Sequence, residues 1–316
     1  MRSVLLSALV LLMFAGILCS QDQNLDVWKN LFDYDGSAAL EIERELLQEG
    51  QDCKVYDLSY ASPKGGRVSA LLVVPEVEGP FVGIVYAHWG LGTYYQYLPE
   101  AMLFARAGVV SLLVNYPWER EGDSFRNHSG YVEAESDREL YIHAALDIRR
   151  GIDLLQAEPH VDATRIAYVG HSIGAQFGGI LSAVDDRLSA VVIIGGTPDL
   201  AAMLIEMPMF KRLRDAVGEE GMSDYLEVNK CLDAIRYVPH ANPTPILFQF
   251  GRYEQYFKED AMQRYADAAS EPKLVKWYST DHEMNEFQAL LDRADWMEQK
   301  LKIPSIKPLL KAALEK

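Results

Sequence analysis

The residues best suited to chemistry in this sequence form a Gly-x-Ser-x-Gly pentapeptide, Gly170-His171-Ser172-Ile173-Gly174, directly after a run of strand-forming residues. A serine hydroxyl becomes a nucleophile when a base takes its proton and the backbone holds it clear of its surroundings. Glycines on both sides of the serine suit a sharp strand-to-helix turn, where a side chain would obstruct close packing. The pentapeptide alone is common, so the hypothesis of a nucleophilic Ser172 depends on its partners.

Two later stretches of the sequence supply these partners. Glu254 follows a strand predicted over residues 245–250, and His282 follows a strand predicted over residues 273–278. In an open α/β sheet, the crevice that holds reacting groups lies at the carboxyl ends of the strands. We therefore predict that Ser172 attacks, that His282 takes its proton, and that Glu254 orients the histidine.

Two other carboxylates compete with Glu254 as the acid. Asp260 is the nearest substitute, although it falls within a helix predicted over residues 258–269. Asp281 is adjacent to His282, and neighbouring side chains on an extended segment point apart. The choice between Glu254 and Asp260 stays open at this stage.

These residues need a framework that brings distant segments together, and apolar patterning predicts one. From residue 81 onward, strand-like and helix-like segments alternate, which predicts a doubly wound, mostly parallel α/β sheet with helices on both faces. The predicted strands are 81–87, 109–115, 165–169, 188–194, 245–250 and 273–278. The predicted helices are 98–107, 137–157, 173–184, 258–269 and 285–301.

Three segments depart from this alternation. Residues 53–60 and 67–74 flank a Pro- and Gly-containing turn and predict an N-terminal antiparallel hairpin. Residues 21–50 predict a mostly helical leader, because Leu40, Ile42, Leu46 and Leu47 give a rough apolar face and Gly50 ends it. Residues 198–242 are too many for a connecting loop and predict a helical cap over the sheet edge. We thus expect one domain over residues 51–316.

The combination of these motifs resembles the α/β-hydrolase superfamily over about residues 51–302, and within it the dienelactone-hydrolase-like and prolyl-oligopeptidase-like esterases and peptidases. The matching features are the nucleophile elbow at Ser172, the acid loop at 251–254 and the late strand-end His282. The resemblance implies an α/β-hydrolase fold and a serine hydrolase that forms an acyl-enzyme. The acid loop of those families usually reads Gly-x-x-Asp, whereas this chain has Glu254. Dienelactone hydrolases proper use cysteine, so Ser172 indicates their esterase-like relatives.

The resemblance also locates an oxyanion hole, in which backbone amides stabilise the alkoxide formed during acyl transfer. One donor is the Ile173 amide at the start of the helix after the nucleophile. The second comes from the loop that begins with His88, either from Trp89 or, one residue on, from Gly90. We expect His88 to shape this loop. His171 is expected to pack beside the nucleophile without acting as the base.

Composition and charge narrow the choice of partners. A formal net charge of −16 and a pI near 4.9 argue against nucleic acid as a partner. The sequence lacks His-Glu-x-x-His, paired Cys-x-x-Cys, a Gly-x-Gly-x-x-Gly after a strand and a Gly-Lys-Ser/Thr loop, so neither a metal nor a nucleotide cofactor is implied.

The first residues have the pattern of a targeting segment. Met1 and Arg2 precede an apolar run over residues 4–18, which is shorter than the ~20 residues that cross a bilayer. Residues 1–20 therefore read as a secretory signal peptide that is cleaved after Ser20, leaving a secreted or periplasmic protein without a membrane span. A lipoprotein carrying lipid on Cys19 is the less favoured alternative.

Cleavage of the signal peptide leaves Cys53 and Cys231 in an oxidising compartment. Either a disulfide or two buried thiols agrees with the sequence. The oligomeric state is not indicated.

The function predicted from these features is an exported serine hydrolase that cleaves a carboxylic ester, on a small molecule or on a carbohydrate. Peptidase activity on the same fold is one alternative. The other is a non-catalytic relative that binds a ligand or partner in the same crevice.

Overall fold

A computed structural model describes residues 25–50, 52–90, 92–120 and 133–308. The predicted signal peptide over residues 1–20, with Cys19, lies outside the described residues. Within those ranges, no helix combines the length and the apolar character that a bilayer span requires.

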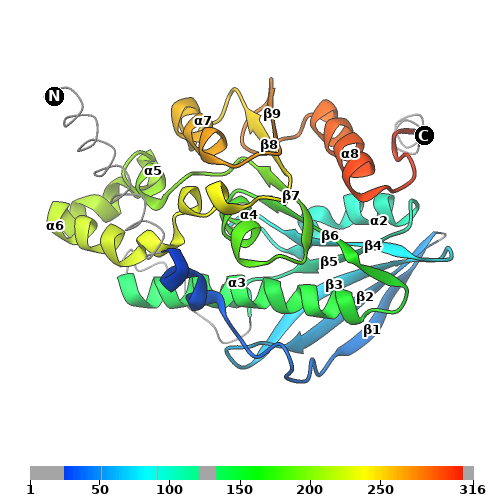
Figure 1. The fold of residues 1–316 in the computed structure, drawn as a ribbon. Coiled ribbons are helices and arrows are strands. Elements are labelled where there is room, and N and C mark those ends of the chain that lie inside the picture. Colours follow the sequence, from blue (N-terminus) through cyan, green and yellow to red (C-terminus); the bar gives the residue numbers. More distant parts are fainter. Residues whose placement is uncertain (1–24, 51, 91, 121–132, 309–316) are drawn as a thin grey trace, which may run out of the picture.

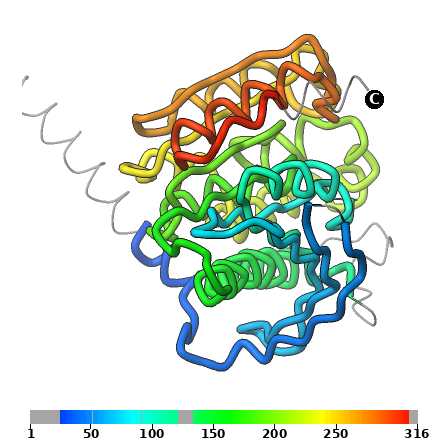
Figure 2. The backbone as a smooth tube through the Cα atoms, turned by 90° about the vertical axis from the view of Figure 1, so that its right-hand side faces the viewer, coloured from blue at the N-terminus to red at the C-terminus, as the bar shows by residue number. Residues whose placement is uncertain are grey.

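One mixed sheet of nine strands organises the fold, with the order β1-β2-β3-β5-β4-β6-β7-β8-β9. Strands β1, β2, β3 and β5 pair antiparallel, and the strands from β5 through β4 to β9 pair parallel. The strands are β1 (Glu43–Glu49), β2 (Cys53–Ala61), β3 (Arg67–Pro75), β4 (Phe81–Ala87), β5 (Val109–Val114), β6 (Val161–His171), β7 (Leu188–Ile194), β8 (Ile246–Gly251) and β9 (Lys273–Tyr278). The N-terminal strands lie at one end of the molecule, and the C-terminal elements lie at the other (Figures 1 and 2).

Helices cover both faces of this sheet, and each face has its own apolar core. One core contains side chains of α3, α4, α7 and the cap, and the other contains side chains of α2 and α8. The long helices are α2 (Leu98–Ala105), α3 (Ala134–Ala157), α4 (Ile173–Val184), α6 (Lys211–Asn229), α7 (Glu259–Ala268) and α8 (Phe287–Leu301). Shorter helical turns are η1 (Asn30–Phe32), η2 (Tyr94–Tyr97), η3 (Pro117–Glu119), α5 (Leu200–Leu204), η4 (Pro208–Phe210), η5 (Lys230–Leu232), η6 (Ala234–Arg236) and η7 (Val238–His240).

The predicted fold class is confirmed: the sheet is mostly parallel, doubly wound and preceded by the antiparallel β2–β3 hairpin. Four elements have the predicted bounds, namely β4, α4, β7 and β9. Residues 198–242 contain only helical elements, as expected for a cap. Helix α6 packs on the start of α3, where the Tyr225 hydroxyl donates to Asp137 Oδ2 at 2.9 Å and Asn229 Nδ2 donates to the Ala134 carbonyl at 3.1 Å.

The predicted helical leader is wrong for its second half. Residues 25–32 are helical, but β1 occupies residues 43–49 and pairs antiparallel with β2. The side chains of Leu46 and Leu47 are 46% and 53% exposed, so they form no buried helix face. A register shift between Leu46 and Gln48 marks a β-bulge, which breaks the strand alternation in the sequence. Pairing with the neighbouring strand β2 overrides the helix propensity of Leu and Glu here.

The two cysteines of the described residues are free and buried. Of the two arrangements that the sequence allows, the structure therefore has the pair of buried thiols. Burial raises the pKa of Cys53 and of Cys231, which keeps both sulfurs protonated.

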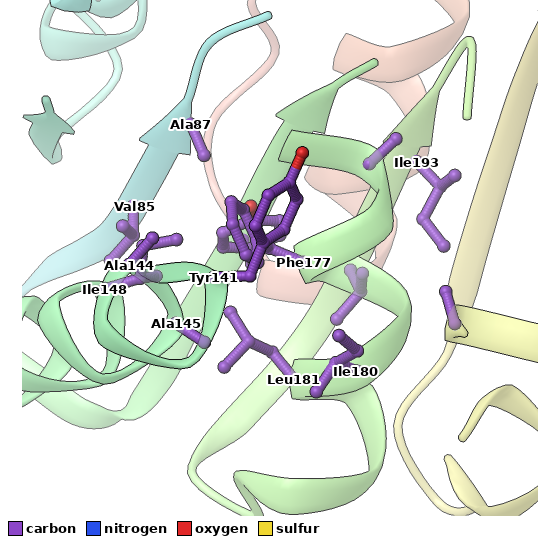
Figure 3. Close-up of a cluster of buried hydrophobic side chains, with 14 of the residues drawn as sticks. Val85, Ala87, Tyr141, Ala144, Ala145, Ile148, Phe177, Ile180, Leu181 and Ile193 are labelled. Atoms are coloured by element: carbon purple, nitrogen blue, oxygen red, sulfur yellow. The ribbon is translucent and has the colours of Figure 1, made fainter. Parts of the chain in front are cut away.

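A tightly packed apolar cluster supports α4. Side chains from four elements meet there, and Figure 3 labels Val85 and Ala87 of β4, Ala144, Ala145, Ile148 and Tyr141 of α3, Phe177, Ile180 and Leu181 of α4, and Ile193 of β7. Small residues on α3 and β4 let α4 lie close to the sheet. The helix that follows Ser172 is consequently packed against both the sheet and α3.

Candidate active site

Ser172 occupies the sharp turn between β6 and α4, with φ +57° and ψ −109°. A positive φ is costly for a residue with a side chain and persists only where the surroundings enforce it. The Ser172 amide donates to the Ile194 carbonyl at 2.8 Å, which ties the turn to β7. The serine is half-buried.

Both glycines of the pentapeptide are required by close backbone approach. A Cβ on Gly170 would lie 2.2 Å from the Gly174 carbonyl oxygen. A Cβ on Gly174 would lie 2.3 Å from the carbonyl oxygen of Ala87. Real Cβ atoms do not approach oxygen this closely, so the turn is built for glycine at both positions.

His282 and Glu254 come together although they are 28 residues apart in the chain. His282 Nδ1 lies 2.7 Å from Glu254 Oε2, and both side chains are 2% exposed. Glu254 Oε1 accepts a hydrogen bond from the Tyr256 amide at 2.8 Å, so both oxygens of this carboxylate are engaged. The loops that follow β8 and β9 thus form a buried histidine–carboxylate pair.

The other two candidate acids point elsewhere. Asp260 Oδ1 accepts from the Ala261 amide at 3.0 Å within the first turn of α7, and Asp281 Oδ1 accepts from the Glu283 amide at 3.2 Å. The geometry therefore selects Glu254 as the carboxylate that pairs with His282.

An aromatic frame surrounds His282. The rings of Tyr256 and Phe257 stand edge-on to its imidazole, with centroids 4.7 and 5.6 Å away, and the His171 ring lies at 4.9 Å. Packing of this kind restricts the orientation of the ring. Sequence motifs did not predict these neighbours. The only signal for the two aromatics is their position shortly after Glu254, beyond Gln255.

Ser172 and His282 lie on the same edge of the sheet and are joined through His171. Among the hydrogen bonds of the described residues, none connects the Ser172 hydroxyl to His282. The connection runs instead through His171 Nε2, which lies 2.8 Å from the His282 carbonyl oxygen. Catalytic hydrogen bonds are often long in ligand-free sites and shorten when substrate binds.

His171 is neutral at ordinary pH. Burial lowers its pKa to about 3, and the neighbouring His282 acts in the same direction. Its Nδ1 lies 2.8 Å from Gln96 Nε2, so that nitrogen accepts and Nε2 carries the proton donated to His282. Both ring nitrogens are occupied, which agrees with the expectation that His171 packs beside the nucleophile.

The loop after β4 presents backbone amides to this edge of the sheet. The Trp89 amide donates to Gln96 Oε1 at 3.0 Å, while the Gly90 amide takes no part in the hydrogen bonds of the described residues. His88 Nδ1 donates to the Trp89 carbonyl at 2.7 Å, and the Tyr116 hydroxyl donates to the His88 carbonyl at 2.6 Å. His88 therefore shapes the loop, as expected, and among the described residues the Trp89 amide has a hydrogen-bond partner while the Gly90 amide has none.

The Ile173 amide begins α4, and the first amides of a helix have no partner inside the helix. Gln96 is the residue that sequence reasoning missed, because a glutamine within a run of tyrosines matches no motif.

The described residues contain no candidate metal site. In the ranges that the structure describes, there is no group of three or more His, Cys, Asp or Glu able to hold a metal ion. A cavity of about 150 Å³ lies between α3 and α6 and is lined by Met222, Tyr225 and Val228 among others. It includes none of Ser172, Glu254 and His282.

Comparison with protein families gives a match to the acetyl xylan esterase (AXE1) model over residues 28–200. Among curated proteins, the esterase FrsA of Salmonella typhimurium is 24% identical over 266 residues. That match covers 78% of this chain and 59% of FrsA, so the chain spans about three fifths of the length of these relatives.

Solved structures of similar fold include two acetyl xylan esterases. The enzyme from Thermoanaerobacterium sp. JW/SL YS485 has a TM-score of 0.72 at 17% identity, covering 87% of this chain and 93% of that one. The enzyme from Paenibacillus sp. R4 has a TM-score of 0.73 at 17% identity, covering 89% and 94%. An acylaminoacyl peptidase from Pyrococcus horikoshii has a TM-score of 0.63 at 18% identity, covering 80% and 42%. At these identities the likeness establishes the α/β-hydrolase fold.

Because the pKa of His171 is lowered in the folded protein, we predict that the free energy of unfolding decreases in acid. The pKa falls from 6.5 for a free imidazole to about 3 in the folded protein. As the pH drops through this interval, the unfolded chain binds a proton that folded His171 rejects, and the free energy of unfolding decreases by up to about 1.4 kcal/mol per pH unit. Urea unfolding of the wild type and of His171→Gln between about pH 4 and pH 7 measures the difference in slope.

The His171→Gln variant should lose this contribution to the slope even where it is less stable than the wild type at pH 7. Substitution of the exposed His160 by Asn is the matched control and should keep the wild-type slope. Equal slopes for the wild type and His171→Gln would contradict the assignment of a neutral, buried His171.

Proposed function

Because the chain belongs to the acetyl xylan esterase (AXE1) family, we propose that it hydrolyses carboxylic esters with Ser172 as nucleophile, His282 as base and Glu254 as the acid. The observation that carries this proposal is the 2.7 Å contact between His282 Nδ1 and Glu254 Oε2. This buried pair lies on the sheet edge that also holds the strained serine turn. A Ser-His-acid triad requires these three groups in this chain order on an α/β-hydrolase sheet.

In the first half-reaction, Ser172 Oγ attacks the ester carbonyl carbon while His282 Nε2 takes the hydroxyl proton. The tetrahedral intermediate then expels the alcohol, which receives that proton from His282, and an acyl-serine remains. Glu254 holds Nδ1–H toward itself and stabilises the imidazolium that forms in between. In the second half-reaction, His282 takes a proton from water, the water oxygen attacks the acyl-serine carbonyl, and the carboxylic acid is released as Ser172 regains its proton.

Two backbone amides stabilise the oxyanion in this proposal. Ile173 supplies one from the start of α4, where the helix dipole adds positive potential. For the second, the engagement of the Trp89 amide by Gln96 favours Gly90. Each donor of this kind contributes about 3 to 4 kcal/mol to the stabilisation of the transition state.

The substrate that we propose is an acyl ester, with acetyl groups on a carbohydrate such as xylan as the first choice and small-molecule esters as the second. Support comes from the family match and from the two acetyl xylan esterase structures of similar fold. The acylaminoacyl peptidase neighbour keeps peptide-bond cleavage as the alternative activity. Release of acetate from acetylated xylan, compared with release of aniline from aminoacyl anilides, separates the two.

Replacement of the nucleophile is the first test. Ser172→Ala should abolish labelling by a fluorophosphonate probe and lower the turnover of p-nitrophenyl acetate at least about 1000-fold, because the remaining catalysis comes from substrate binding and the oxyanion hole alone. Active-site labelling and initial rates measure the two effects. Equal labelling of wild type and variant would exclude Ser172 as the nucleophile.

Replacing each candidate carboxylate by its amide tests which residue is the acid of the triad. Glu254→Gln should lower kcat by about 100- to 10000-fold, since the neutral amide neither orients nor stabilises His282 as a carboxylate does. Asp260→Asn is the matched control, and its kcat should stay within about twofold of the wild type. A severe loss confined to Asp260→Asn would reverse the assignment.

We further propose that the protein is exported, which makes it secreted or periplasmic. Removal of the predicted signal peptide would leave Gln21 as the first residue of the mature chain. N-terminal sequencing of the protein from its native host checks this. An uncut chain would contradict export, and a lipid-modified Cys19 at the N-terminus would replace cleavage after Ser20 by the lipoprotein alternative.

A further inference from the structure

The Gln96 side chain in η2 connects the loop of Trp89 with the His171 side chain, which belong to separate sequence motifs. Its Oε1 accepts from the Trp89 amide at 3.0 Å, and its Nε2 donates to His171 Nδ1 at 2.8 Å. A backbone N–H only donates, so the carboxamide oxygen must face Trp89 and the carboxamide nitrogen must face His171. The orientation of Gln96 is therefore determined at both ends.

That orientation determines the proton position on His171. With Nδ1 accepting from Gln96, the neutral ring carries its proton on Nε2, which donates to the His282 carbonyl at 2.8 Å. A continuous chain of hydrogen bonds results, from the Trp89 amide through Gln96 and His171 to the backbone of His282. We call these four residues the Gln96 relay.

The relay joins three loops that carry the reacting groups. Trp89 lies in the loop after β4, His171 precedes the nucleophile at the end of β6, and His282 lies in the loop after β9. The imidazole of His282 is already held by Glu254 at 2.7 Å, and the His282 amide donates to Gln255 Oε1 at 3.3 Å. Of these contacts, only the hydrogen bond from His171 Nε2 to the His282 carbonyl connects the His282 backbone to the turn that holds Ser172.

We propose that Gln96, acting through His171, is a positioning residue for ester hydrolysis, which sets the spacing between the oxyanion loop, Ser172 and His282. This proposal rests on the proposed function. By engaging the Trp89 amide, Gln96 also directs the Gly90 amide to the oxyanion. Misplacement of reacting groups by about 1 Å costs on the order of 100-fold in rate, so a relay of this kind has a measurable effect.

The opposite role for Gln96 makes a different prediction. If the Trp89 amide were the oxyanion donor, the Gln96 carboxamide would obstruct it, and removal of Gln96 would raise kcat. The direction of the change in kcat therefore separates a positioning residue from an obstruction.

Gln96→Leu tests the relay, because leucine has a similar size and makes no hydrogen bond. On p-nitrophenyl acetate, kcat should fall about 10- to 100-fold while KM stays within about threefold, since the loss concerns the transition state. Gln288→Leu is the matched control. Its carboxamide bonds Asp292 on the exposed side of α8 at 2.7 Å, and kcat should not change.

Gln96→Glu provides a measurement, the pH dependence of kcat/KM, that would not change if Gln96 had only a structural role. A carboxylate accepts from the Trp89 amide but cannot donate to His171 Nδ1. The relay then stays complete only when His171 is an imidazolium that donates from both nitrogens. The ratio of kcat/KM for Gln96→Glu to that of the wild type should therefore decrease as the pH rises from about 5 to about 8. The charged and titratable groups facing His171, namely His282, Arg293 and His88, with Glu254 behind His282, are the same in both proteins.

The outcomes separate the two proposals. An unchanged or increased kcat for Gln96→Leu, or a ratio for Gln96→Glu that is independent of pH, would overturn the relay. In that case Ser172→Ala still reports on the esterase reaction, and its inactivity leaves the proposed function standing. Full turnover by Ser172→Ala would overturn the proposed function and the relay with it.

Discussion

The approach of α4 to the end of β4 is the contact on which the rest of the site depends. Gly174 lies so close to Ala87 that any side chain at position 174 would overlap the Ala87 carbonyl. This contact pulls the start of α4 onto the sheet and forces Ser172 into a positive φ. The apolar cluster of Figure 3, which includes Ala87, packs α4 against β4, β7 and α3. The two glycines of the pentapeptide thus allow both a hydroxyl and a helix N-terminus to lie at the sheet edge.

The strand order explains why partners far apart in the chain meet at this edge. Strands β4, β6, β7, β8 and β9 are consecutive neighbours and parallel, so the loops after their carboxyl ends converge. Glu254 and His282 follow adjacent strands and form a buried pair. The second carboxylate oxygen of Glu254 accepts a hydrogen bond from the Tyr256 amide.

On the face of the sheet that α2 and α8 cover, a buried polar network keeps the loops after β8 and β9 in place. Arg293 of α8 binds Glu100 of α2 through two hydrogen bonds of 3.0 and 2.6 Å and donates to Gln249 of β8 at 2.7 Å. Gln249 in turn donates to the Tyr278 hydroxyl at 2.9 Å. A charge pair of this kind is costly to bury unless each group is satisfied, and here it links α2, α8, β8 and β9. Helix α2 directly follows Gln96, so the same network also anchors the relay.

Much of the architecture and part of the site followed from the sequence alone. Periodicity determined the alternation of strands and helices, because continuous apolar runs mark strands buried on both faces and a 3.6-residue period marks covering helices. Strand-end positions then singled out Ser172, Glu254 and His282 as candidates.

Only the tertiary structure decided what depends on contact between separate segments of the chain. It turned residues 43–49 into a strand, paired His282 with Glu254 in preference to Asp260, and left Cys53 and Cys231 unbonded. It also brought Gln96 between Trp89 and His171, for which no motif exists. The physical reason is the same in each case: hydrogen bonds and register between separate segments follow from packing, and the pattern within one segment carries no record of them.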